Sequence, residues 1–383
     1  MIFHTVKGTE SIFDIARRYS IFPSRIIEEN DIDPQRLIPG EELLILTPTR
    51  TVSVRGGDTL SGICHRFGVR KQSLILANPR LLRDERIFPG QILSVKQQTP
   101  AFGTASSLGF YKRGCPIEKL SRVMPHLTYV AICSAEIKGE GVYHFFRDTE
   151  ARGLTTKRGK LPLLGIKDTT GGGFLKDPSR RESVTEGMIA IAKSAYKGIY
   201  LELDPGAMAV PEVCELLLEL RKRLLGCDLI LFTGIAGEYS PIAADIPDGV
   251  ILFPDTKDAA RDFAAACESG RAMLSLDCEA VTDDGERMDI KSALDIAYRA
   301  GAVIDHSDDG CSFKYNKYKM GQRRECRVSF PSLPSTLELM KESSSLGYMG
   351  FAFDVSTVPI SYLCMINAGF LRADYSLLSS ADI

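Results

Sequence analysis

Residues 198–206, GIYLELDPG, place two carboxylates two positions apart inside an otherwise apolar run. Side chains at positions i and i+2 of a β-strand point to the same face, so Tyr200, Glu202 and Asp204 would share one face. Two neighbouring acids in an apolar environment are costly unless they are paired or take part in chemistry. We interpret Glu202 and Asp204 as a candidate general acid and a supporting carboxylate. The alternative is an acid pair neutralised by Lys or Arg, or one that lies on a solvated rim.

The elements that would position these acids follow a polar linker, which we assign to residues 98–106. The region 107–376 alternates short apolar runs with helical patterns, and residues 377–383 form a tail. The expected strands are 107–112, 127–135, 161–167, 198–204, 228–235, 249–254, 272–278 and 347–355. The clearest helical patterns cover 180–196, 211–225, 256–269 and 334–346.

Eight strands with intervening helices predict the α/β class and a (β/α)8 TIM barrel, since such barrels typically have about 250 residues. A doubly wound open sheet is the alternative, but no G-x-G-x-x-G turn supports a nucleotide site there. In a barrel, Tyr200, Glu202 and Asp204 would line the interior and approach the carboxyl-terminal mouth, where barrel active sites lie.

The N-terminal part of the chain contains two copies of one pattern. The segment VKGTESIFDIARRYSIFPSRIIEEN, from Val6, aligns without a gap with VRGGDTLSGICHRFGVRKQSLILAN, from Val54. Ser11 and Thr59 are placed to cap a helix, and a Pro-Gly turn precedes a closing strand in each copy. The sequence therefore predicts two small βααβ modules, at residues 1–48 and 49–97.

This pattern resembles the LysM domain, and the second copy matches it closely through GGDTLSGI, AN and IFPGQ. The resemblance implies binding to N-acetylglucosamine polymers such as peptidoglycan or chitin. The binding positions that it implies in the second copy are Gly57, Asp58, Thr59, Leu60, Ile87, Phe88 and Pro89. In the first copy they are Thr9, Glu10, Ser11, Ile12, Ile38 and Pro39, of which Thr9 and Glu10 depart from the usual Gly and Asp. The alternative is that these loops only maintain the fold, with Asp58 and Thr59 as caps.

Two LysM-like modules before a barrel resemble the bacterial spore cortex-lytic enzymes and their relatives, which carry a glycoside hydrolase family 18 domain. That family hydrolyses β-linked N-acetylglucosamine polymers by substrate assistance: a Glu protonates the leaving oxygen, and an Asp two residues earlier orients the attacking acetamide. The resemblance places Asp204 at the Glu position and Glu202 at the Asp position, so the two acids are exchanged. Lys197 stands where the outermost Asp of the family motif is expected, and Gly198 matches.

Other positions also depart from the family pattern. In LFPD, Asp255 is kept, but Pro254 replaces a Tyr that binds the acetamide. Phe353 stands in place of the Trp that floors the cleaved sugar, and Ser329 replaces another Trp. We therefore expect a glycan-binding protein in which hydrolysis is weak or lost. The alternative is an active N-acetylglucosaminidase or chitinase-like hydrolase that uses Asp204 as the acid, supported by Glu202 and Asp255, with Tyr200 and Phe353 on the sugar.

Composition excludes other classes of function. The net charge of −2 gives no nucleic-acid signal, and no leader or long apolar run indicates a membrane protein. The five histidines do not have the spacing of a metal motif, so no metal or cofactor is expected. The ten cysteines are expected to be mostly reduced core residues. We expect association with the coat or cortex of a spore, together with coat proteins, or otherwise a cytoplasmic or cell-wall location.

Overall fold

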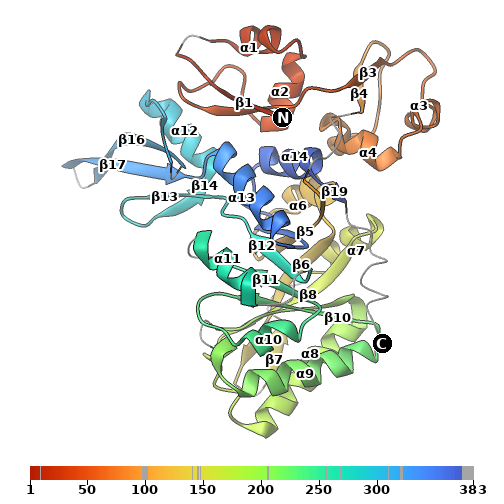
Figure 1. Cartoon of the computed structure of the whole chain (residues 1–383), viewed down its shortest axis with the longest axis vertical. Helices are drawn as coiled ribbons and strands as arrows, with labels where there is room; N and C mark the ends of the chain where they lie inside the picture. The colour runs from red at the N-terminus through yellow and green to blue at the C-terminus, as the bar shows by residue number, and fades with distance from the viewer. Residues whose placement is uncertain are drawn as a thin grey trace. The chain divides into compact units, whose positions relative to one another are not determined.

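The computed structural model (Figure 1) describes residues 1–8, 10–96, 102–139, 141–144, 146, 148–204, 207–254, 257–266, 270–308, 310–319 and 322–372. The chain forms two compact units. The first unit contains Met1–Gly103, Asp277–Leu339 and Thr357–Leu371, and the barrel unit is built mainly from Thr104–Leu276 and Met340–Ser356.

The described part of the barrel unit contains a closed parallel barrel of eight strands. In barrel order they are β5 (Thr104–Lys112), β6 (Tyr129–Lys138), β8 (Leu161–Asp168), β9 (Gly198–Glu202), β10 (Ile230–Ile235), β11 (Gly249–Leu252), β12 (Ala272–Ser275) and β18 (Gly350–Asp354). Because β5 pairs with both β18 and β6, the sheet closes on itself. The predicted (β/α)8 TIM barrel and its eight strands are confirmed, although β5 begins inside the segment that we assigned to the linker.

The helices around the barrel strands follow the expected alternation. They are α6 (Ile117–Val123), η1 (Met124–His126), α7 (Thr149–Lys157), α8 (Pro178–Ala195), η2 (Ala207–Ala209), α9 (Glu212–Leu225), α10 (Pro241–Asp245) and α11 (Lys257–Ala266). The short strand β7 (Gly141–His144) extends the sheet antiparallel to β6. Nearer the C-terminus are α13 (Leu333–Ser345), α14 (Ile360–Gly369) and β19 (Leu371–Arg372). The four helical patterns identified in the sequence correspond to α8, α9, α11 and α13.

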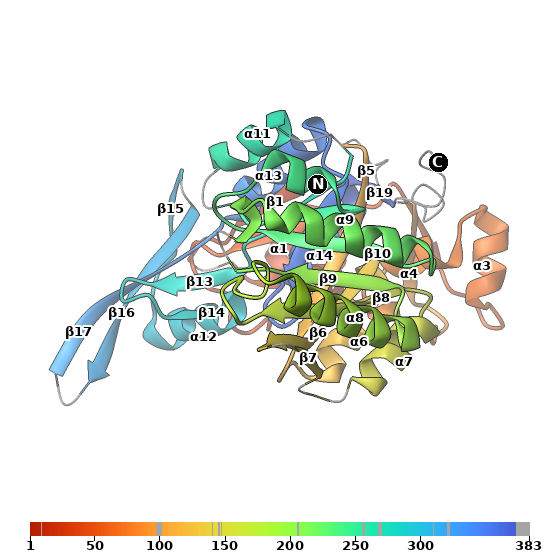
Figure 2. The ribbon, with the colours of Figure 1, turned by 90° about the horizontal axis from the view of Figure 1, so that it is seen from below.

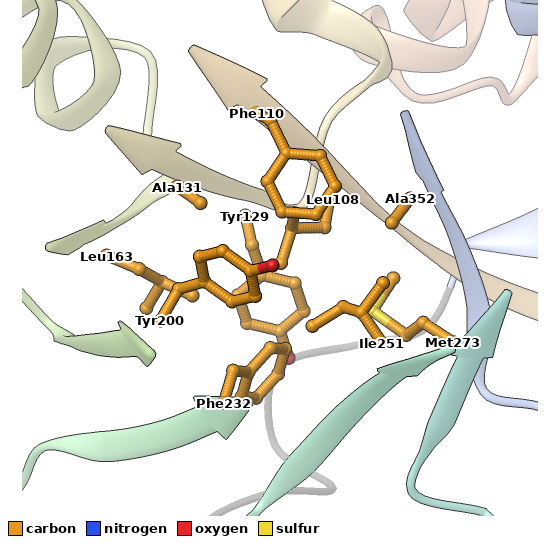
Figure 3. Close-up of a cluster of buried hydrophobic side chains, with 10 residues drawn as sticks. All are labelled: Leu108, Phe110, Tyr129, Ala131, Leu163, Tyr200, Phe232, Ile251, Met273 and Ala352. Atoms are coloured by element: carbon orange, nitrogen blue, oxygen red, sulfur yellow. The ribbon is translucent and has the colours of Figure 1, made fainter. Parts of the chain in front are cut away.

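Side chains from all eight strands fill the interior of the barrel (Figure 3). They belong to Leu108, Phe110, Tyr129, Ala131, Leu163, Tyr200, Phe232, Ile251, Met273 and Ala352. The interior is therefore a packed core, and any pocket for a ligand must lie above this layer, at the carboxyl ends of the strands.

The two N-terminal modules have the predicted βααβ order. The first comprises β1 (Ile2–Thr5), α1 (Ile12–Arg18), α2 (Pro23–Asn30) and β2 (Glu42–Ile45), and the second comprises β3 (Arg50–Ser53), α3 (Leu60–Phe67), α4 (Lys71–Leu76), the short α5 (Arg80–Arg83) and β4 (Ile92–Lys96). Ser11 caps α1 and Thr59 caps α3, as expected. Asn30 and Asn78 each bind the closing strand, because their Oδ1 atoms accept the N–H groups of Leu44 and Ser94 at 2.7 and 2.8 Å.

Residues 277–339 form an insertion between β12 and β18 that the sequence analysis did not separate from the barrel. Its described strands form an antiparallel sheet in the order β14 (Arg287–Asp289), β13 (Glu279–Thr282), β17 (Gln322–Phe330), β16 (Gly310–Lys319) and β15 (Asp305–Ser307). Figure 2 shows the long hairpin of β16 and β17, and α12 (Ile290–Ala300) packs on this sheet. The insertion belongs to the first compact unit.

Among the helices in the described residues, none has both the length and the apolar character that a membrane-spanning segment requires. Nine cysteines lie in the described part of the chain, and each is a free thiol. The assigned tail, residues 377–383, lies outside the described residues.

Candidate glycan-binding loops and the mouth of the barrel

The first loop of the second module is held by hydrogen bonds to its own backbone. Gly57 adopts a φ of +84°, which favours glycine, and the Asp58 carboxylate accepts the N–H of Arg55 at 2.9 Å. This bond and the Arg66 guanidinium hold the pKa of Asp58 below its usual range. The Thr59 hydroxyl accepts the N–H of Gly62 at 3.0 Å, and Leu60 is buried in the module core. Asp58, Thr59 and Leu60 thus shape the loop, in which Gly57 and Thr59 are exposed.

The second loop of this module presents an aromatic side chain to solvent. Phe88 is 49% exposed, Pro89 is exposed, and Ile87 packs against the module core. The Phe88 N–H donates to Oε1 of Gln91 at 3.1 Å, which fixes the backbone of the loop. The Arg80 guanidinium lies 5.7 Å from the centroid of the Phe88 ring. The guanidinium lies over one face of the ring, and the ring remains half-exposed to solvent.

The two loops leave the same end of the β3–β4 pair. The N–H of Gly90 donates to the carbonyl of Val54 at 2.8 Å, and the N–H of Val54 donates to the carbonyl of Gln91 at the same distance. The sequence-predicted binding residues of the second copy are therefore brought together at one edge of the module.

The first copy is built in the same way, but the insertion covers its second loop. Ile38 is 3% exposed and packs in a core formed with residues of the insertion. The N–H of Ile304 donates to the carbonyl of Pro39 at 2.9 Å, and a Cβ on Gly40 would lie 2.1 Å from the carbonyl oxygen of Ile304. The loop of the first copy is therefore engaged in an intramolecular contact. Thr9, in the other loop, lies outside the described residues.

At the mouth of the barrel, charged side chains pair between neighbouring strands. Glu202, at the end of β9, lies opposite Lys167 of β8, and their charged atoms are 3.2 Å apart. Lys112 of β5 pairs with Asp354 of β18 at 2.8 Å. Glu202 was predicted from the sequence, whereas Lys167, Lys112 and Asp354 were not. Each of those three follows an inward-facing position by two residues. Strand alternation could therefore have predicted from the sequence that they face the mouth of the barrel.

The electrostatics of this mouth favour paired charges. Burial alone would raise the pKa of Asp354, but hydrogen bonds from Lys112 and Ser356 outweigh it and hold the pKa below its usual value. The same carboxylate raises the pKa of Lys112, although partial desolvation of the amine acts in the opposite direction. Burial, assisted by the charge of Glu202, raises the pKa of the Cys133 thiol to about 12, so this thiol is neutral at physiological pH.

The two acids of the opening segment are placed differently. The strand β9 ends at Glu202, and Asp204 lies beyond it with an exposed side chain. Its carbonyl accepts the N–H of Ala207 at 2.9 Å. Asp255, the third predicted catalytic carboxylate, lies outside the described residues, whereas Pro254 before it is half-buried.

The two aromatic rings predicted to contact sugar are both buried. Tyr200 is 1% exposed and belongs to the interior core (Figure 3). Phe353 is fully buried and occupies the position after inward-facing Ala352, so its ring lies on the helix side of β18. In this structure neither ring offers a face to a sugar. Ser329 is an exposed residue of β17 in the first unit.

Replacing Tyr200 with phenylalanine is expected to leave stability unchanged or to raise it by about 1 kcal/mol, because a buried hydroxyl without a partner costs free energy. Its hydroxyl has no hydrogen-bond partner among the described residues, and burial raises its pKa well above the usual value. Urea unfolding of wild type and Tyr200→Phe measures the change. A loss of more than 1 kcal/mol would show that the hydroxyl has a stabilising partner.

Comparison with known proteins gives both parts of the chain a counterpart. The LysM domain model matches residues 4–46 and 52–96. YdhD of Bacillus subtilis (strain 168), named as a candidate sporulation-specific glycosylase, is 26% identical over 257 residues, which cover 63% of this chain and 59% of YdhD. The cell wall-binding protein YocH of the same strain is 31% identical over 106 residues, which cover 27% of this chain and 36% of YocH.

Solved structures establish the fold. The spore cortex-lytic enzyme SleL of Bacillus megaterium QM B1551 superposes with a TM-score of 0.72 at 17% identity, covering 97% of this chain and 98% of SleL. A chitinase from Chromobacterium violaceum ATCC 12472 superposes with a TM-score of 0.63 at 12% identity, covering 70% of this chain and 99% of the chitinase. The chain therefore contains two LysM domains and a (β/α)8 barrel with the fold of SleL and of family 18 chitinases.

Proposed function

We propose that this protein binds N-acetylglucosamine polymers, such as peptidoglycan, through its second LysM domain, and that its barrel hydrolyses them weakly or not at all. The observation that carries the second part is the ion pair between Lys167 and Glu202, 3.2 Å apart at the mouth of the barrel. The pair supports the alternative in which a lysine partners the acid, and because Lys167 is 62% and Glu202 36% exposed, it contributes at most about 1 kcal/mol.

Substrate-assisted hydrolysis needs one carboxylate free to hold the acetamide and one acid within reach of the glycosidic oxygen. Glu202, at the first position, has its charge engaged by Lys167. Asp204, at the second position, has a side chain one methylene shorter than the Glu of the family, and a misplacement of about 1 Å can cost about 100-fold in rate. The lysine partner of Glu202 and the shorter side chain of Asp204 together support the proposal of weak or absent hydrolysis.

Binding is assigned to the second domain because its two loops remain accessible. Phe88, Pro89 and the backbone around Gly57 are exposed at one edge of the module. The equivalent loop of the first domain, residues 38–40, is buried against the insertion. We also propose that the protein resides where such glycan is found, in the cortex or coat of a spore or in the cell wall.

Hydrolysis is tested with wild type and Asp204→Asn on cortex fragments, vegetative peptidoglycan and chitin oligomers. Products are followed by mass spectrometry of released fragments, and binding by co-sedimentation in the same samples. We expect both proteins to sediment with peptidoglycan and to release few or no reducing N-acetylglucosamine ends above the buffer control. Extensive release by wild type but not by Asp204→Asn would instead establish a working hydrolase with Asp204 as its acid.

A further inference from the structure

Three potential metal ligands, two from one hairpin and one more than 250 residues earlier in the sequence, meet inside the first unit. They are Glu42, at the start of β2, His306 in β15, and Cys311 in β16. One ligand atom from each lies within 4.8 Å of the other two. Nδ1 of His306 is 3.2 Å from Oε1 of Glu42 and 3.7 Å from Sγ of Cys311.

The hydrogen bond of Nε2 of His306 determines which ring nitrogen is available to bind a metal. Nε2 of His306 lies 2.7 Å from the carbonyl oxygen of Gly40, which can only accept, so Nε2 carries a hydrogen. In the neutral ring, Nδ1 then presents its lone pair to the carboxylate and the thiol. A histidine that binds a metal through one nitrogen usually donates its other N–H to a carbonyl or carboxylate in this way.

The other two ligands are also positioned by the surrounding structure. The second carboxylate oxygen of Glu42 accepts the N–H of Leu333 at 2.7 Å, which leaves Oε1 facing the histidine. Cys311 is 3% exposed and held in a strand, whereas the side chain of His306 is 34% exposed. The surrounding structure thus holds Glu42 and Cys311 in place, and solvent can reach the cluster beside His306.

The two distances from the histidine nitrogen match the edges of a tetrahedron around one ion. With zinc bonds of about 2.0 Å to nitrogen and oxygen and about 2.3 Å to sulfur, the tetrahedral edges are about 3.3 Å for N···O and about 3.5 Å for N···S. The corresponding distances here are 3.2 and 3.7 Å. We propose that Glu42, His306 and Cys311 bind a zinc ion or a similar divalent cation, with water in the fourth position.

Such an ion would join the first LysM domain to the insertion. Glu42 belongs to the domain, whereas His306 and Cys311 belong to the insertion sheet. The same contact buries Ile38 and covers the second loop of the first domain. The metal would therefore stabilise the contact between the first LysM domain and the insertion. In the proposed function, this contact covers a binding loop of the first domain, so that only the second domain binds glycan.

The test uses the full-length protein, reduced and freed of metal by chelation. It is titrated with Co²⁺, whose thiolate complexes absorb in the near ultraviolet, and with Zn²⁺ in competition with a chromophoric chelator. We expect one metal per chain and a thiolate-to-cobalt charge-transfer band. Cys311→Ser should abolish the band and weaken zinc binding at least ten-fold. The matched control is Cys326→Ser, a buried cysteine of β17, which should retain both.

A second variant protects the test against a folding defect in Cys311→Ser. Glu42→Gln keeps an oxygen that can accept the N–H of Leu333 but removes the anionic ligand, and it should also weaken zinc binding. Zinc should raise the unfolding temperature of wild type more than that of either ligand variant. Absence of stoichiometric binding to wild type, or a cobalt band that survives Cys311→Ser, would overturn the proposal. Neither readout depends on glycan binding or hydrolysis.

Discussion

Replacing Phe88 with alanine is expected to weaken binding to peptidoglycan about ten-fold, because the substitution removes an exposed aromatic face that can pack on a sugar ring. Phe88 is 49% exposed on a loop whose backbone is fixed by Gln91, so the ring is presented without a large ordering cost. Co-sedimentation with purified peptidoglycan over a range of glycan concentrations measures the change.

The control for this variant lies in the other LysM domain. Phe22 is also 49% exposed, but it is the residue before α2 of the first domain and belongs to neither predicted binding loop of that domain. Phe22→Ala should therefore bind as wild type does. Equal losses in the two variants would indicate non-specific adsorption through exposed rings. A loss confined to Phe22→Ala would move the binding site to the first domain.

Replacing Glu29 with glutamine is expected to stabilise the first unit above pH 7 by roughly 2 to 3 kcal/mol. Glu29 is fully buried in α2, and burial raises its pKa to about 7, although the neighbouring Arg25 offsets part of this effect. The native state then holds the proton more tightly than the unfolded chain, in which the pKa is about 4.5. Favourable protonation of Glu29 is complete below the unfolded value and is lost as pH rises through the folded value.

The measurement is urea unfolding of both proteins at several pH values. The free energies of unfolding should converge below the unfolded pKa and diverge between it and about pH 7. Glu85→Gln is the control, because Glu85 is a surface residue paired with Lys71, and exposed ion pairs contribute at most about 1 kcal/mol. A Glu29→Gln variant that is less stable above pH 7 would show that the ionised carboxylate and Arg25 stabilise the unit together.

The local sequence determined the barrel strands and the two LysM domains, because these depend on the types and spacing of residues close together in the chain. Short apolar runs located the eight barrel strands, because a parallel strand buried on both faces has a nearly continuous apolar sequence. The gapless repeat located both LysM domains, and its capping residues Ser11 and Thr59 act as the local chemistry requires. Strand alternation also placed Tyr200 inside the barrel and Leu201 on the opposite face.

Tertiary structure decided the features that join distant segments. The two-residue alternation of a strand predicts which face a side chain occupies, but it does not predict which residue of the next strand lies beside it. The pairing of Glu202 with Lys167 therefore depended on strand order and register. Residues 38–40 have the same local pattern as residues 88–90, yet only the first set is covered by an insertion more than 200 residues away in the chain. Glu42, His306 and Cys311 match no metal-binding spacing, because they meet only when that insertion packs against the first domain.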